Sequence, residues 1–124
     1  MKYILIIFLS FIGLYSTAQK DIEIEDASHY ANDSVRICSK IYGGKYLENV
    51  KGSPTFLDVG GIYPQAPLTL VIWGNVRKQF HRALELLYNK QVCIYGVIQM
   101  YKGKPQIVIT NEYQILQAIK VDVN

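Results

Sequence analysis

Hydrophobic and polar residues alternate along three segments in the first half of the chain, which predicts three β-strands. These segments are residues 34–44, 55–61 and 68–74. The side chains expected to face the interior are Val35, Ile37, Ile41, Leu57, Val59, Leu68, Leu70 and Ile72. Those expected to face outward include Arg36, Cys38, Lys40, Tyr42, Phe56, Thr69, Val71 and Trp73. Residues 43–54 are polar and marked by glycines, so we expect a long hairpin loop between the first two strands.

The hydrophobic period changes to that of a helix in residues 75–90. Asn75 is the expected N-cap. Arg77 and Lys78 oppose the helix dipole, so we expect the regular helix to begin near Phe80. The apolar positions with helical spacing are Val76, Phe80, Ala83, Leu84 and Leu87.

The period then returns to two, and residues 91–101 and 104–115 form a predicted β-hairpin. Its tip is YKGKP, residues 101–105. The pattern leaves open whether the tail, residues 116–124, extends the last strand or frays. One or two helical turns, with Asp26 as N-cap, are expected before the first strand.

Three strands, one helix and two further strands are the organisation of an OB-fold. We therefore predict an all-β protein, a five-stranded OB-fold Greek-key barrel with one helix between strands three and four and a short N-terminal helix. In this architecture the helix closes one end of the barrel, which accounts for an apolar stripe among polar residues. A small α+β sandwich is the alternative that the same pattern permits.

Residues 1–18 have the features of a secretory signal peptide. Lys2 precedes an apolar run, and Ser16 and Ala18 supply small side chains at the cleavage subsites. We expect cleavage after Ala18, because the alternative of a membrane anchor needs about 20 apolar residues and a stop-transfer flank. Residues 19–124 would then form a single exported domain, periplasmic or extracellular, without membrane insertion.

The chain of 124 residues carries a formal charge of +3, and loss of Lys2 lowers this to 12 − 10 = +2. Such a weakly basic sum does not argue for nucleic acid, so the placement of the charges must decide. No catalytic motif of the GxSxG, HExxH or Walker type is present. His29 and His81 are too isolated for a metal site. We therefore expect a protein that is not an enzyme and has no cofactor.

Three pieces of the sequence resemble the corresponding pieces of a known family. They are TFLDVGG.YP from Thr55, VIWG from Val71, and G.I..Y.GKPQI.I from Gly96. Together they are similar to the small nucleic-acid-binding OB-fold domains of exported bacterial proteins, which are related to the anticodon-binding kind. The resemblance covers about residues 24–116 and implies a binding module without a catalytic motif.

OB-folds bind on the outer face of strands two and three, flanked by the loop between strands one and two and the loop between strands four and five. That scheme predicts a ligand-binding set of cations and flat rings: Lys45, Tyr46, Lys51, Phe56, Trp73, Tyr101, Lys102 and Lys104. Single-strand binding needs cations for phosphates and rings on which bases stack. The alternatives are that the 101–105 tip is only a turn and that Trp73 packs beneath a loop or the helix.

The function expected from this set is weak, largely sequence-independent binding of single-stranded nucleic acid. A protein- or glycan-binding module that uses the same face is the alternative. A second basic candidate is the predicted helix face of Arg77, Lys78, His81 and Arg82, for which a solvated surface is the simpler interpretation.

Cys38 and Cys93 are the only two cysteines, and both fall on the outward phase of strands that are neighbours in an OB barrel. Opposed residues on antiparallel strands have Cβ atoms about 4.5–5.5 Å apart, near the reach of a disulfide. In an exported chain such a bond persists. We therefore expect a Cys38–Cys93 disulfide, with two separately packed thiols as the alternative.

Overall fold

The computed structural model of the protein describes residues 19–118, and this part of the chain is mostly β-sheet. The predicted signal peptide, residues 1–18, and the end of the tail, residues 119–124, lie outside the described residues. The strands are β1 (Lys20–Asp21), β2 (Ser34–Tyr46), β3 (Thr55–Val59), β4 (Leu68–Ile72), β5 (Gln91–Tyr101), β6 (Lys104–Val108) and β7 (Ile115–Gln117). The helical segments are η1 (Ile24–Tyr30), α1 (Gly74–Arg77), η2 (Leu84–Leu87) and η3 (Glu112–Gln114).

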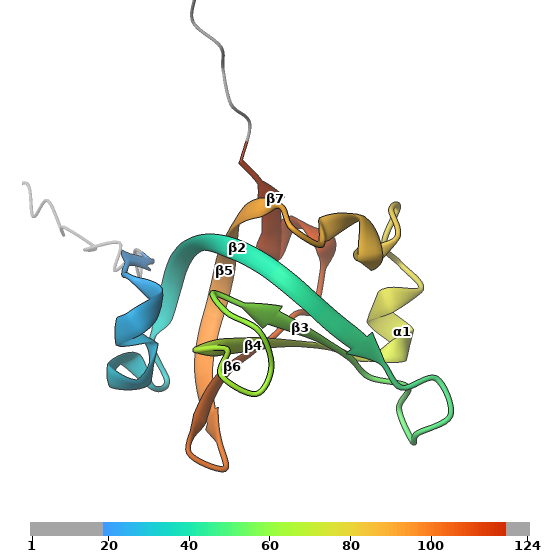
Figure 1. The fold of residues 1–124 in the computed structure, drawn as a ribbon, viewed down its shortest axis with the longest axis horizontal. Coiled ribbons are helices and arrows are strands. Elements are labelled where there is room, and N and C mark those ends of the chain that lie inside the picture. The colour runs from blue at the N-terminus through green and yellow to red at the C-terminus, as the bar shows by residue number, and fades with distance from the viewer. Residues whose placement is uncertain (1–18, 119–124) are drawn as a thin grey trace, which may run out of the picture.

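Five of these strands are linked in a ring (Figure 1). The second half of β2 pairs antiparallel with β3, β3 pairs antiparallel with β4, and β4 runs parallel to β6. β6 pairs antiparallel with β5, and β5 returns to the first half of β2. The fold is therefore all-β and OB-like, as predicted. The ring closes because β2 is long enough to pair with both β5 and β3.

The predicted number of strands is wrong, because the described residues contain seven strands and not five. β1 pairs in parallel with the start of β2, and β7 pairs antiparallel with β5. They are only two and three residues long, too short for alternation to reveal them. The predicted last strand, residues 104–115, is also wrong in its length, because β6 ends at Val108 and η3 follows. The tail therefore does not extend that strand; as far as Gln117 it belongs to the separate strand β7.

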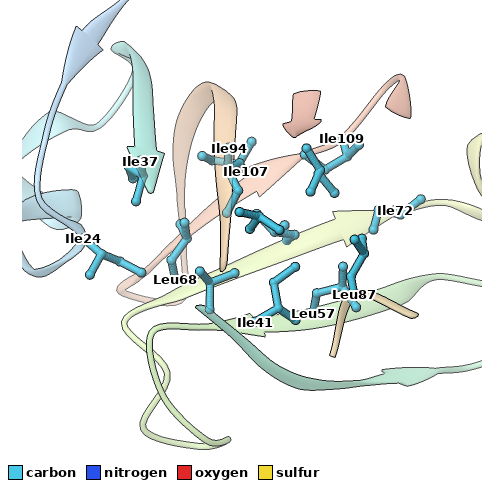
Figure 2. Packing of buried hydrophobic residues seen from close by; sticks show 14 of the residues in the cluster. Ile24, Ile37, Ile41, Leu57, Leu68, Ile72, Leu87, Ile94, Ile107 and Ile109 are labelled. Atoms are coloured by element: carbon cyan, nitrogen blue, oxygen red, sulfur yellow. The ribbon is translucent and has the colours of Figure 1, made fainter. Parts of the chain in front are cut away.

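Alternating hydrophobic residues of the strands fill the interior of the ring (Figure 2). The residues predicted to face inward are all 0% exposed: Val35, Ile37, Ile41, Leu57, Val59, Leu68, Leu70 and Ile72. η1 adds Ile24 and Ala27 to this core, and η2 adds Leu84 and Leu87. These two segments lie on opposite sides of the barrel in Figure 1.

Val71 lies on the outward face of β4, as its place in the alternation predicted, yet only 3% of its surface is accessible. Its neighbours across the sheet are Phe56 on β3 and Val108 on β6. An apolar side chain on each flank removes Val71 from water although it points away from the barrel interior.

A bulge in β2 changes the predicted end of the first strand. The register with β3 shifts between Ile41 and Gly43, and the strand then continues to Tyr46. The hairpin loop predicted over residues 43–54 is therefore shorter. Lys45 pairs with Phe56, and the next residue, Tyr46, belongs to the strand as well. Because successive strand residues point to opposite faces, Lys45 and Tyr46 are separated by the sheet.

The continuous helix predicted over residues 75–90, with its regular part from near Phe80, is also wrong. The α-helical turn α1 ends at Arg77, before Phe80, and η2 is a single 3₁₀ segment. The first turn of α1 has no acidic residue to favour the helix dipole. Basic side chains instead reach other segments: Arg77 Nη2 donates to Glu85 Oε1 at 2.7 Å, and Arg82 Nη2 donates to the Ile115 carbonyl at 3.0 Å. These tertiary contacts and the burial of η2 outweigh helix propensity.

Both predicted N-caps are likewise corrected. α1 is preceded by Trp73 and not by Asn75, and η1 is preceded by Glu23 and not by Asp26. Neither capping residue makes a side-chain hydrogen bond to the helix. Segments this short are held by packing against the barrel rather than by their caps.

The register of β4 can be tested with a pair of substitutions. Leu70→Ala should lower the free energy of unfolding by about 2–5 kcal/mol, because it leaves a cavity in the core. Thr69→Ala, on the outer face of the same strand, should cost less than about 1 kcal/mol. Urea denaturation of both variants measures the difference, and a larger cost for Thr69→Ala would contradict this register.

Candidate ligand-binding groove

A groove of about 500 Å³ lies beside the β3–β4 loop on the outer face of β2, β3 and β4. Its lining residues are Gly44, Lys45, Leu47, Phe56, Asp58, Tyr63 and Thr69. Two predicted ligand-binding residues, Lys45 and Phe56, are therefore brought together here. Sequence reasoning missed the other five, which are Gly44, Leu47, Asp58, Tyr63 and Thr69. Only Tyr63 carried a usable signal, as a large aromatic residue in a proline-rich loop, and it is 73% exposed.

The strand register arranges the outer face as two parallel rows. One row, largely apolar, crosses four strands as Lys45, Phe56, Val71 and Val108. The other is polar and contains Asp58, Thr69, Gln106 and Gln99. A flat ligand on this face would meet a ring and a cation along one edge and hydrogen-bonding side chains along the other.

Gly44 permits the close approach of β2 and β3 beneath the groove. A Cβ at this position would lie 2.4 Å from the Phe56 carbonyl oxygen and 2.8 Å from Leu57 Cδ2. Both distances are shorter than any real contact of a Cβ atom. A side chain at Gly44 would therefore push the two strands apart and move Lys45 away from Phe56.

Asp58, opposite Thr69 in the polar row, places a partly buried carboxyl group on the groove floor. Partial burial raises the pKa of this carboxyl above its usual range. No ion pair involves Asp58 among residues 19–118. The carboxylate is thus held where solvation is reduced, which favours its protonated form.

The 101–105 tip is a tight hairpin turn. Lys102 and Gly103 have φ values of 49° and 77°, the left-handed conformation of a two-residue type I′ turn. The Lys104 ammonium group donates a hydrogen bond to the Pro64 carbonyl at 3.1 Å. That bond ties the tip to the β3–β4 loop, next to Tyr63 of the groove. Tyr101 remains 58% exposed, so contact of this tip with a ligand stays a prediction.

Tyr46 does not reach the groove. It faces α1, where the Arg77 guanidinium lies 3.8 Å from the centre of its ring. Arg77 Nη1 also donates to Thr55 Oγ1, the residue opposite Tyr46, at 2.9 Å. Tyr46 and Thr55 therefore hold Arg77 of α1 against β2 and β3, and we call this contact the clamp.

Trp73 and Lys51 also lie away from the groove lining. Trp73 packs against the β2–β3 loop, where a Cβ on Gly52 would come within 2.9 Å of its ring. It nevertheless keeps 43% of its surface exposed. Lys51 is exposed in the same loop. In Figure 1 this loop lies at the right of the molecule and the β5–β6 tip at the bottom, well apart from each other, so the predicted set does not form one compact site.

The second basic candidate is largely occupied by internal contacts. Hydrogen bonding to Arg77 lowers the pKa of the Glu85 carboxyl, and hydrogen bonding to His81 lowers the pKa of the Glu112 carboxyl. Arg82 is bound to a carbonyl oxygen, as described above. Arg77, His81 and Arg82 thus stabilise the segment after α1, whereas Lys78 is exposed and takes part in no ion pair among residues 19–118.

The two cysteines lie where they were predicted. Cys38 pairs directly with Cys93 across β2 and β5, and a disulfide joins them. Within residues 19–118, His, Cys, Asp and Glu side chains form no cluster suited to a metal ion. Over the same residues, no helix is long and apolar enough to cross a membrane.

Comparison with known proteins supports the fold. No protein-family model and no curated protein matches the chain. A crystal structure assigned as an aspartyl-tRNA synthetase from Leishmania major Friedlin superposes with a TM-score of 0.50 and 10% sequence identity, over 85% of this chain and 22% of that one. An aspartyl tRNA synthetase from Entamoeba histolytica gives a TM-score of 0.49 and 18% identity, over 78% and 21% of the two chains. This chain thus spans about a fifth of each structure's length.

The raised pKa of Asp58 predicts a pH-dependent stability difference. As the pH rises, this carboxyl loses its proton at a lower pH in the unfolded chain than in the folded protein. The free energy of unfolding therefore falls as the pH rises through and above the usual carboxyl range. Asp58→Asn should therefore gain stability relative to the wild type between about pH 3 and about pH 7. Urea denaturation at both pH values measures this change. Glu48→Gln, in the exposed β2–β3 loop, controls for loss of one negative charge, and an advantage of Asp58→Asn that shrinks with pH would contradict the prediction.

Proposed function

We propose that this protein is an exported, non-enzymatic binding module that holds single-stranded nucleic acid weakly and without strong sequence preference. The observation that carries this proposal is the groove, in which a lysine and two aromatic rings line one concave surface. In finer terms, we assign the ring of five strands to the OB-fold Greek-key barrel of small exported bacterial proteins.

The chemistry of the groove suits this ligand. Exposed ammonium groups attract phosphates, and base–aromatic stacking contributes about 1–3 kcal/mol per base. Lys45 and Phe56 lie side by side on the groove floor, and Tyr63 stands at its edge. The tip that carries Tyr101 and Lys102 adds a further ring and cation near that edge. A single strand that follows the groove would meet these groups in succession.

The structural neighbour from Leishmania major adds support of a limited kind. Its name connects it with tRNA, and the likeness involves 22% of its chain. That share is compatible with a nucleic-acid-binding part, and we extend no synthetase activity to the present chain.

A glycan is the second candidate ligand, and Asp58 favours it. Carboxylate, hydroxyl and amide groups in the polar row could bind sugar hydroxyls, while Phe56 offers a flat apolar surface. An anionic carboxylate on the groove floor also repels phosphates at neutral pH. A protein segment could use the same face, with its apolar side chains against Phe56.

The first test is a titration of a labelled single-stranded oligonucleotide at two salt concentrations. We expect binding that weakens with salt, since phosphate neutralisation releases counterions. Replacing Lys102 and Lys104 with alanine should reduce the slope of log affinity against log salt by about 0.7 per lost phosphate contact. The melting temperature should change little, because the tip is exposed.

The matched control replaces Lys78 and Lys90, two exposed lysines that belong neither to the groove lining nor to the 101–105 tip, so that it lowers the net charge equally. An equal loss of affinity in the control would show a general charge effect rather than a site. If the wild type binds no oligonucleotide at low salt, the nucleic-acid proposal fails. Titration with oligosaccharides then tests the second candidate.

Stacking predicts a different response from the aromatic residues. Tyr101→Ala and Phe56→Leu should each weaken oligonucleotide binding, by up to about 1–3 kcal/mol where a base stacks on the ring. The salt slope should hardly change, because stacking releases few ions. Tyr113→Ala removes an exposed ring that does not line the groove and serves as the control. A similar loss with all three variants would argue against stacking in the groove.

A further inference from the structure

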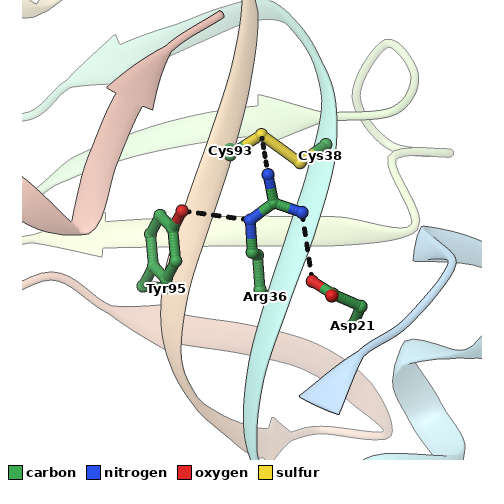
Figure 3. The surroundings of a disulfide bond; sticks show 5 residues. All are labelled: Asp21, Arg36, Cys38, Cys93 and Tyr95. Carbon is green, nitrogen blue, oxygen red and sulfur yellow. Dashed lines mark hydrogen bonds and ion pairs between the residues drawn. A yellow bond between two sulfur atoms is a disulfide. The ribbon is translucent and has the colours of Figure 1, made fainter. Parts of the chain in front are cut away.

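The disulfide lies on the outer surface of the barrel, and its two sulfur atoms have different surroundings (Figure 3). Cys38 is exposed and lines a cavity of about 330 Å³ between β2 and the N-terminal segment. Cys93 is partly buried and does not belong to that lining. A small molecule in the cavity therefore lies beside Cys38 and not beside Cys93.

A fixed guanidinium group accompanies the other sulfur atom. Arg36 Nη2 donates a hydrogen bond to Cys93 Sγ at 3.4 Å. The same side chain donates from Nε to Tyr95 Oη and from Nη1 to Asp21 Oδ1, both at 3.0 Å. In Figure 3 these two partners flank Arg36 below the disulfide. A positive charge held in this way stabilises a thiolate on Cys93.

We propose that Cys38 is a site of reversible thiol–disulfide exchange at which a small aminothiol forms a mixed disulfide. The thiolate sulfur of the aminothiol attacks Cys38 Sγ and forms a new S–S bond. The bond between Cys38 and Cys93 breaks, and its electron pair leaves on Cys93 as a thiolate beside Arg36. No net oxidation occurs, because one disulfide replaces another, and attack by Cys93 on Cys38 reverses the reaction.

The cavity favours a thiol that carries a positive charge. Its lining includes the carboxylates of Asp21, Glu23 and Asp26 against the single guanidinium of Arg36. An ammonium group near the attacking sulfur is attracted by this excess of negative charge, whereas a carboxylate is repelled. A cavity of about 330 Å³ has ample room for a small aminothiol.

The barrel can tolerate this exchange. Backbone pairing between β2 and β5 continues on both sides of the cysteines, from the Ser34–Val97 pair to the Lys40–Gln91 pair. The reaction would take place on the first half of β2, whereas the groove uses the second half. The inference therefore stands independently of the proposed ligand.

Peptide mapping after a short reaction tests the choice of sulfur. The disulfide-bonded protein is treated with cysteamine at neutral pH and quenched with excess N-ethylmaleimide. We expect cysteamine on Cys38 and the maleimide on Cys93, at least about tenfold more often than the reverse, because the thiolate is stabilised at Cys93. Equal labelling, a preference for Cys93, or no mixed disulfide in the folded protein would overturn the proposal.

Rate measurements test whether Arg36 stabilises the departing Cys93 thiolate. Arg36→Gln should slow formation of the adduct by about threefold or more, since a poorer leaving group departs more slowly. Lys40→Gln, on the same face of β2, removes a cation that does not contact the disulfide and should leave the rate unchanged. Circular dichroism verifies that both variants are folded. An equal effect of the two substitutions would remove Arg36 from the mechanism.

The preference for an aminothiol is measured against a free disulfide. The ratio of the cysteamine rate to the thioglycolate rate should be greater for the protein than for 2-hydroxyethyl disulfide, which has no charged surroundings. High salt should reduce the difference, because it screens the carboxylates. A ratio equal to that of the free disulfide would contradict the preference for a cationic thiol.

Discussion

The double pairing of β2 is the constraint on which the rest of the structure depends. Its first half pairs with β5 and its second half with β3. The bulge after Ile41 separates these two regions, and bulges increase the local bend and twist of a strand. This bend lets a single strand close the ring, and it also sets which residues beyond the bulge face the groove. The disulfide and the groove thus lie on consecutive parts of one strand.

Much of the core could be predicted from the sequence because each inward position is determined by its own strand. Leu70 alternates with Thr69 and Val71, and this local pattern was sufficient to place it inside. The burial of Val71 could not be obtained in this way. It arises from Phe56 and Val108, which only the strand topology brings alongside.

The candidate site was predicted less well, for reasons that concern single residues. Extension of β2 by a few residues moved Tyr46 from a supposed loop to the face that contacts Arg77. The continuous helix predicted over residues 75–90 was wrong because the hydrophobic period carries no information on the hydrogen bonds that Arg77 and Arg82 make to other segments. Asp58 gave no signal at all, because a lone acidic residue in a strand becomes informative only when its burial is known.

The alternation along β2 and β3 separates recognition from folding. Lys45 and Phe56 face the groove, whereas their chain neighbours Tyr46 and Leu57 face the clamp and the core. A substitution at a residue that faces the groove can alter the charge, shape or stacking surface of the groove without creating a cavity in the barrel. Ligand preference can therefore drift during evolution, or be redesigned in the laboratory, while the scaffold retains its stability. Gly44 is the exception, since any larger residue there would disturb both properties at once.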